Sequence, residues 1–153
     1  MSWQKTVIGR VDFFVPFDEV PYKQRPRLGK NGAYTPRKTV MWERTIQQEA
    51  VRWCSEWATF PGTVHMRVCI KKPLPASCPK RWYGKDNTVK PDVDNVAKLV
   101  MDALNGVAYM DDKQVTELQV RRLQYCKPEQ QGGLGVGIDY IEDRWVNDER
   151  RKA

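Results

Sequence analysis

Three segments of the chain, residues 10–15, 63–71 and 134–141, alternate apolar and polar residues with the period of two that is typical of β-strands. The predicted strands span residues 10–15, 63–71, 114–125 and 134–141. In the first of them Val11, Phe13 and Val15 share one side, and Pro16 ends the pattern. The alternation is most regular over residues 63–71, which predicts a strand with one buried face. The apolar side of that strand consists of Val64, Met66, Val68 and Ile70.

Two other segments repeat apolar residues every three or four positions, which is the period of an amphipathic helix. The first helix is predicted over residues 38–58. Its apolar stripe consists of Trp42, Ile46, Ala50, Trp53 and Trp57. Three tryptophans on one stripe would also suit base stacking, but a helix stripe normally packs against a sheet, so we assign it to the core. The second helix is predicted over residues 92–105, where Asn105-Gly106 is a typical C-terminal stop.

Residues 20–40 and 72–91 show no such period and are broken by proline and glycine, which favours loops. We expect the first to be an extended basic loop or to include a small hairpin, and the second to be a mobile loop. The resulting order, β-α-β-α-β-β, predicts an α+β fold: a mixed sheet of about four strands with two main helices on one face. We expect a single domain over residues 1–153, with a core at about 10–141 and a charged tail at 142–153.

The charge balance adds an expected partner to this picture. The chain has 26 Lys and Arg against 19 Asp and Glu, so its formal net charge is +7. Such a balance suits nucleic acid or an anionic membrane surface. No apolar run approaches the roughly 18 residues that a membrane span needs. The N-terminus lacks the pattern of a signal peptide, so we expect a cytoplasmic location.

Histidine and cysteine contribute little to the expected site. His65, the only histidine, falls on the polar side of its strand and is expected at the surface. Cys54, Cys69, Cys78 and Cys126 show no CxxC spacing, so we expect reduced structural thiols rather than zinc ligands. Because the one histidine is expected at the surface, an enzyme with this sequence would work without a histidine general base. This favours chemistry by carboxylates and a bound metal.

Basic residues concentrate in the two loops. The candidate DNA-binding side chains are Lys23, Arg25, Arg27, Lys30, Arg37, Lys38, Lys80, Arg81, Lys85 and Lys90. For any one of them, a solvated and solubilising surface is the alternative. Aromatic residues lie between them, and their rings favour nucleic acid because they can stack on exposed bases. These aromatic residues are Tyr22, Tyr34, Trp82 and Tyr83.

An acidic segment inside this basic chain is the strongest functional signal. Residues 90–118 contain six carboxylates, and like charges brought together raise each other's proton affinity. A divalent cation would offset that repulsion, and Mg²⁺ takes oxygen ligands. Asp92 and Asp94 open the second predicted helix, and we expect the chain after it to return Asp111 or Asp112 to the helix start. The alternative is that Asp92 is only a helix cap.

Two neighbours of these aspartates have competing interpretations. Lys98 follows Asp94 by four residues on the same helical face. It suits either a routine ion pair or a cation that stabilises charge on a scissile phosphate. Asp102, one turn further on, is expected to pair with Lys98 or to face solvent.

Together these motifs resemble the RusA family of Holliday junction resolvases. KPDVDNVAKLVMDALNG, followed by DDKQV, is similar to the family pattern D-x-D-N-x-x-K, a helix ending near D-A-L, and D-D-x-Q. The upstream stretch KQRPRLGKNGAYTPRKT is similar to the basic region of phage and prophage members. The likeness covers about residues 10–141, and its central motif is specific.

The resemblance implies a homodimeric endonuclease that uses one or two Mg²⁺ ions per subunit to cut four-way DNA junctions with paired symmetrical nicks. It implies metal-ligand roles for Asp92, Asp94 and Asp112, and an essential catalytic role for Lys98. Asp111 also matches a family position and is a possible ligand. A bacterial cell with a phage or prophage gene is the implied setting. The segment 72–90 is longer than in the shortest members, so its junction contacts are not implied.

Other classes of function stay open on the residues alone. A non-catalytic nucleic-acid-binding module would use its aspartates only for caps and ion pairs, and would show no Mg²⁺-dependent nicking. A metal-dependent phosphoesterase or nuclease acting on other substrates would share the acidic cluster. A small phosphate substrate, however, would not need so many lysines and arginines in the loops.

Overall fold

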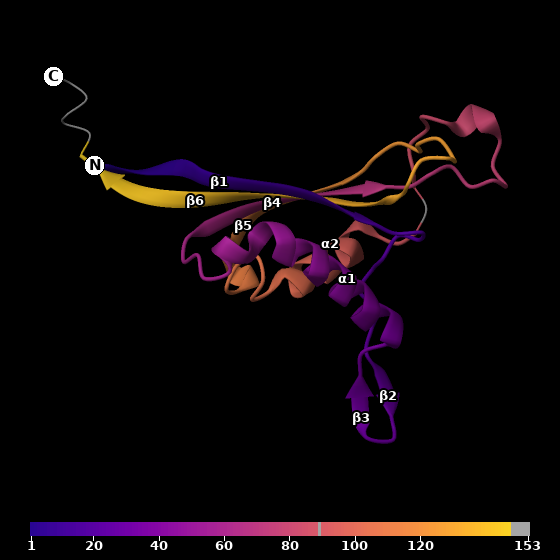
Figure 1. The fold of residues 1–153 in the computed structure, drawn as a ribbon, viewed down its shortest axis with the longest axis horizontal. Coiled ribbons are helices and arrows are strands. Elements are labelled where there is room, and N and C mark those ends of the chain that lie inside the picture. Colours follow the sequence, from indigo (N-terminus) through magenta and orange to yellow (C-terminus); the bar gives the residue numbers. More distant parts are fainter. Residues whose placement is uncertain (89, 148–153) are drawn as a thin grey trace.

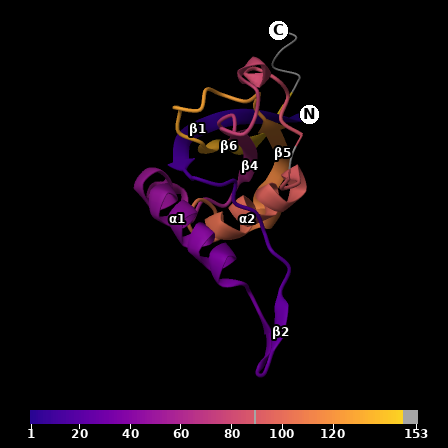
Figure 2. The same ribbon diagram turned by 90° about the vertical axis from the view of Figure 1, so that its right-hand side faces the viewer.

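A four-stranded mixed sheet forms the centre of the computed structural model, which describes residues 1–88 and 90–147. The strand order is β1-β6-β4-β5. The strands are β1 (Ser2–Pro16), β4 (Thr63–Lys71), β5 (Val115–Arg122) and β6 (Gly133–Val146). β6 runs antiparallel to β1 and β4, whereas β4 and β5 are parallel. Two helices, α1 (Arg37–Cys54) and α2 (Val93–Leu104), cover one face of the sheet (Figures 1 and 2). The predicted α+β fold is confirmed.

The hydrophobic core lies between that face and the helices. The apolar side of β4 is at most 1% exposed, as its alternation predicted. From α2, Val96, Leu99 and Val100 are fully buried in the same cluster. An isolated 12-residue helix would be marginal in water. Each buried aliphatic side chain contributes about 1.5–3 kcal/mol, so packing fixes α2 and the acidic residues at its ends.

Smaller elements fill the connections. β2 (Arg27–Gly29) and β3 (Gly32–Tyr34) form a hairpin that projects from the body (Figure 1). The basic loop therefore contains the small hairpin that the sequence allowed. Short 3-10 helices are η1 (Ser55–Trp57), η2 (Lys80–Trp82) and η3 (Asp112–Gln114). In the described part of the chain, no helix is long and apolar enough to cross a membrane. All four cysteines are free thiols, as predicted.

The strands β1 and β6 were predicted too short, whereas β5, predicted over residues 114–125, spans only Val115–Arg122. β1 begins at Ser2 rather than at residue 10, and β6 continues to Val146 rather than ending at residue 141. Residues 142–146 therefore belong to a strand and not to a charged tail. Residues 148–153 of that predicted tail lie outside the described residues.

The placement of Trp53 in the core was wrong. Trp53 is 50% exposed, and its indole nitrogen donates to Glu49 at 3.1 Å. Steps of four residues along α1 lead from Trp42 to the fully buried Cys54, and a helix turns by about 100° per residue. At that rotation Trp53 lies between Trp42 and Ile46 on the helical wheel, so its angular position on α1 does not account for its exposure. Trp57 lies beyond α1, in η1, and stacks on Tyr140 with ring centroids 4.2 Å apart.

Candidate active site

Asp92 and Asp94 stand exposed at the start of α2. Asp92 has the N-cap position, and its carbonyl accepts the Val96 N–H at 3.3 Å, but its side chain makes no capping hydrogen bond. The interpretation of Asp92 as only a helix cap therefore finds no support. The helix N-terminus carries a partial positive charge, which helps to tolerate two neighbouring carboxylates there. Both side chains remain available to a ligand.

The second pair of aspartates lies at the other end of α2. After α2 the chain folds back against the end of the helix. There the Tyr109 hydroxyl donates a hydrogen bond to the Met101 carbonyl at 2.9 Å. This bond holds residues 109–112 beside the last turn of α2 rather than the first. A 12-residue helix is about 18 Å long, so the expected return of Asp111 or Asp112 to the helix start was wrong. Within residues 1–88 and 90–147, no three His, Cys, Asp or Glu side chains gather into a metal-binding group.

Gln114 anchors the Asp111–Asp112 segment. Its amide oxygen accepts the Met110 and Asp111 N–H groups, both at 2.9 Å. Its amide nitrogen donates to the carbonyls of Phe60 at 2.7 Å and Gly62 at 2.9 Å. The glutamine of the D-D-x-Q motif thus ties the acidic pair to the segment that leads into β4.

The two adjacent aspartates differ in role. Asp111 caps η3, where its carboxylate accepts the Lys113 N–H at 3.0 Å. That backbone hydrogen bond, with a side-chain hydrogen bond to Asp112, lowers the pKa of Asp111. Partial burial and the neighbouring Asp111 raise the pKa of Asp112. Asp111 is therefore held by the local structure of η3, and Asp112 is held beside it by the hydrogen bond between the two carboxyl groups.

Lys98 is exposed on the outer face of α2, and in the described residues it forms no ion pair with Asp94. Asp102 pairs instead with Lys23, at 3.2 Å, and the same ammonium contacts Glu43 at 2.8 Å. Burial opposes the charged form of Lys23, but the two carboxylates outweigh it and raise its pKa. The expectation that Asp102 pairs with Lys98 or faces solvent was wrong, and Lys23 bridges α1 and α2.

The other basic candidates lie at the surface. Arg25, Arg27 and Lys30 sit on or beside the β2–β3 hairpin, and Arg37 begins α1. Lys38 pairs with Glu19 at 3.0 Å. In the second loop Lys80, Arg81, Lys85 and Lys90 are exposed, and the Lys85 ammonium lies 4.1 Å from the Trp82 ring centroid. These cations are spread over two loops rather than gathered in one patch.

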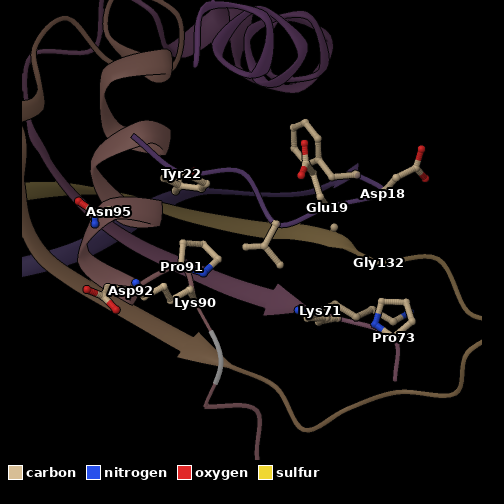
Figure 3. Close-up of a pocket in the computed structure, with 14 residues that line it drawn as sticks. Asp18, Glu19, Tyr22, Lys71, Pro73, Lys90, Pro91, Asp92, Asn95 and Gly132 are labelled. Atoms are coloured by element: carbon tan, nitrogen blue, oxygen red, sulfur yellow. The ribbon is translucent and has the colours of Figure 1, made fainter. Parts of the chain in front are cut away.

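A pocket of about 570 Å³ opens beside Asp92 (Figure 3). Its lining includes Tyr22 and Asn95, and its charged side chains are mixed. They are Lys71, Lys72, Lys90, Asp18, Glu19 and Asp92 itself. Sequence reasoning proposed Lys90 and Tyr22 as DNA contacts but missed Lys72 and Asn95. Asn95 follows Asp92 by three residues, a spacing that places both on one helical face and was a usable signal.

Two comparisons with known proteins extend these observations. The family model of Endodeoxyribonuclease RusA matches residues 16–138. YqaN of Bacillus subtilis (strain 168), an uncharacterised protein, is 32% identical over 127 residues, which cover 75% of this chain and 89% of YqaN. The family match contains the D-x-D-N-x-x-K segment and the D-D-x-Q segment together with β4, β5 and the first part of β6.

Proposed function

Because this chain belongs to the RusA endodeoxyribonuclease family, we propose that it is a Mg²⁺-dependent endonuclease that resolves four-way DNA junctions. Paired symmetrical nicks would complete this step of DNA recombination and repair in the bacterial cytoplasm. One observation carries the proposal: Asp92 and Asp94 open a buried helix with their carboxylates exposed, in a chain of net charge +7. A basic protein that presents a paired carboxylate site is suited to phosphodiester chemistry on a polyanion.

The free carboxylates of Asp92 and Asp94 fit a magnesium ion. Mg²⁺ in nucleotide-processing sites is usually held by one or two carboxylates together with substrate phosphates, so the two aspartates need no complete protein cage. One or two bound Mg²⁺ ions would activate water and neutralise charge on the scissile phosphate. Asp92 and Asp94 would hold the ion on the rigid start of α2. Lys90, beside Asp92, would draw the DNA backbone toward it.

The position of Asp112 supports a homodimer. Asp112 lies beyond the far end of α2, so it cannot join Asp92 and Asp94 within one chain without breaking the packing of that helix. If Asp112 serves the same metal centre, it comes from a second chain. A two-fold dimer would contain two such composite centres, one for each strand that is cut.

Lys98 and the surface cations complete the proposed machinery. Lys98 points outward from α2 one turn after Asp94, where a cation would stabilise the extra charge of the phosphate in the transition state. The arginines and lysines of the hairpin and of loop 72–90 would hold the arms of the junction. Lys23 is excluded from this set because its ammonium is already paired with two carboxylates.

Asp94→Asn separates binding from catalysis and so tests the proposal. It removes a metal ligand and one negative charge, so the variant should bind a labelled junction at least as tightly as the wild type while losing cleavage in Mg²⁺. Asp86→Asn makes the same chemical change in an exposed loop position and should cleave normally. Normal cleavage by Asp94→Asn would contradict the assigned site.

A further inference from the structure

Residues 72–88 are folded against the chain that follows β5, at the end of the sheet opposite the labelled N-terminus (Figure 1). The Leu74 N–H donates to the Cys126 carbonyl at 2.9 Å, and the Tyr125 N–H donates to the Lys85 carbonyl at 3.0 Å. Leu74 is 3% exposed and Tyr125 5%. Backbone pairing and burial therefore give a defined shape to residues that the sequence assigned to a mobile loop.

Two aromatic side chains of this segment lie beside lysine ammonium groups. The Lys85 ammonium is 4.1 Å from the Trp82 ring centroid and occupies one face of that ring. The Lys127 ammonium is 5.8 Å from the Tyr83 ring centroid. Tyr83 is 54% exposed, whereas Trp82 is partly buried, so Tyr83 is the more accessible ring. A ring beside a cation suits a nucleotide, because the ring can stack on the base while the cation attracts the phosphate.

A hollow of about 710 Å³ lies between Tyr83 and the residues that follow β5. Its volume falls within the range of roughly 300–1,000 Å³ that is typical of ligand sites. Among its charged lining residues, Arg121 and Arg122 outnumber Asp86. Arg121 is exposed and lines the same space as Tyr83. The hollow therefore combines an accessible ring with a positive charge, the two parts that a nucleotide site needs.

Arg122 connects this hollow with the start of α2. Its guanidinium donates to the Pro91 carbonyl at 2.5 Å, and Pro91 directly precedes Asp92. The hollow and the first aspartate of the motif are thus held next to each other. A DNA strand whose phosphate lies at Asp92 can therefore continue into the hollow.

An unpaired strand suits the hollow better than a duplex does. A ring side chain stacks on the face of a base, and in a duplex that face is covered by the neighbouring base pairs. Taking a base out of a duplex costs a few kcal/mol, and the cost is least where the base is already unpaired. The branch point of a junction interrupts the stack of base pairs, so it is the place where such bases occur.

We propose that Tyr83, Arg121 and Lys127 form a binding surface for unpaired nucleotides of the strand that is cut. Tyr83 stacks on a base, and the two cations contact the phosphates beside it. The inference rests on the proposed function for the identity of the polymer and adds a preference for branch points with unpaired nucleotides. It gives the second loop, whose junction contacts the family resemblance does not imply, a specific partner.

Binding of an oligothymidine of about ten nucleotides, compared with a linear duplex, tests this surface by fluorescence anisotropy in EDTA. Tyr83→Ala should weaken oligothymidine binding by about 5–100-fold, the range for the loss of one stacked base, and leave duplex affinity unchanged. Tyr83→Phe keeps the ring and should bind like the wild type. Arg121→Gln should reduce the log–log salt slope for oligothymidine by about 0.7, as expected for one lost phosphate contact.

Trp145→Ala is the matched control. Trp145 is 51% exposed in β6 at the other end of the sheet, and its loss should change neither affinity. The proposal is overturned if the wild type does not bind oligothymidine, if Tyr83→Ala binds it like the wild type, or if Tyr83→Phe loses as much affinity as Tyr83→Ala. Equal losses on oligothymidine and duplex, or an unchanged salt slope in Arg121→Gln, would overturn it as well. Because EDTA prevents cleavage, a junction-cleavage assay in Mg²⁺ decides the nuclease proposal separately.

Discussion

Asp94, in the first turn of α2, and Asp112, in η3 beyond its last turn, are separated by the full length of that helix. The separation is fixed by packing, because the buried face of α2 and the Tyr109 hydrogen bond hold both ends against the body. If both aspartates serve one reaction, each reaction centre draws on two chains.

This arrangement predicts rescue between inactive variants. Asp94→Asn and Asp112→Asn should each lose junction cleavage. A mixed dimer has two centres. In one of them, Asp94 of the Asp112→Asn chain and Asp112 of the Asp94→Asn chain are both intact, whereas the other centre carries both defects. When the two variants are mixed in equal amounts and refolded together, a substantial fraction of the wild-type nicking should return. Only one strand of each junction should be cut. Single-turnover cleavage of a labelled junction measures the recovered nicking.

A mixture of Asp92→Asn with Asp94→Asn is the matched control. Both changes fall on the same half of the centre, so every centre in a mixed dimer keeps one defect and no rescue is expected. Rescue in neither mixture, despite demonstrated exchange of subunits, would mean that each chain forms its own centre.

Lys98→Gln should slow cleavage without weakening DNA binding much. The ammonium is exposed and unpaired with Asp94, so its loss should cost little stability. A cation that acts mainly on the transition state should cost about 10²–10³-fold in rate when removed. Lys113→Gln, in η3, provides a control at another exposed lysine near the site. An unchanged single-turnover rate in Lys98→Gln would remove this residue from the mechanism.

Lys23→Met should reduce stability rather than DNA affinity. The change leaves Glu43 and Asp102 without their shared cation, and we expect a loss of about 1–2 kcal/mol in the free energy of unfolding. The folded-state pKa of Lys23 is raised, so its contribution is complete below the unfolded pKa of about 10.4 and is lost at higher pH. Urea denaturation at pH 7 measures the loss.

Arg27→Met is the counterpart on the exposed hairpin. It should leave unfolding unchanged but flatten the dependence of junction affinity on salt, by about 0.9 in the log–log slope if one phosphate contact is lost. Equal effects of the two variants on salt dependence would contradict the structural role of Lys23.

Asp139→Asn should weaken the fold in a way that depends on pH. The Asp139 carboxylate accepts from Arg67 at 2.9 Å and from Arg10 at 2.8 Å. Burial alone would raise its pKa, but the two guanidinium groups outweigh burial and lower it. The stabilisation is therefore present above the unfolded pKa of about 3.9 and is lost as pH falls through the lower folded value.

The variant should lose about 1–3 kcal/mol in the free energy of unfolding at pH 7. The difference from the wild type should shrink as the pH is lowered below about 4. Asp12→Asn, whose carboxylate is 67% exposed and 3.7 Å from Arg67, should have a much smaller effect. A difference that stays constant down to pH 2 would contradict the ion-pair explanation.

The sequence predicted most reliably those elements whose residue pattern is set by burial in the core. Val64 to Ile70 alternate because one face of β4 is buried, and that constraint is visible in the residue pattern. The start of β1 and the end of β6 were missed because their tryptophans, Trp3 and Trp145, are exposed and follow no pattern of burial. Trp53 was misplaced because its position on the helical wheel fits the stripe of α1, and only the packed structure shows that Cys54 is buried there while Trp53 is exposed.

The candidate site was predictable in its residues and not in its geometry. The D-x-D spacing and the helix that follows it located Asp92 and Asp94 correctly at a helix start. The path of residues 105–112 depends on Gln114 and Tyr109, whose hydrogen bonds join segments far apart in sequence. Lys23 was assigned to DNA binding because its ion-pair partners, Glu43 and Asp102, lie 20 or more residues away in the sequence and could not be foreseen from it.

Cleavage of a four-way junction tests the nuclease proposal most directly. The wild type, incubated with a labelled junction or a linear duplex of the same sequence, should give paired symmetrical nicks in the junction only. These nicks should require Mg²⁺, disappear in EDTA and be absent with Asp92→Asn, while junction binding persists. Nicking that continues in EDTA or with Asp92→Asn, or junction binding without any cleavage in Mg²⁺, would contradict the proposed function.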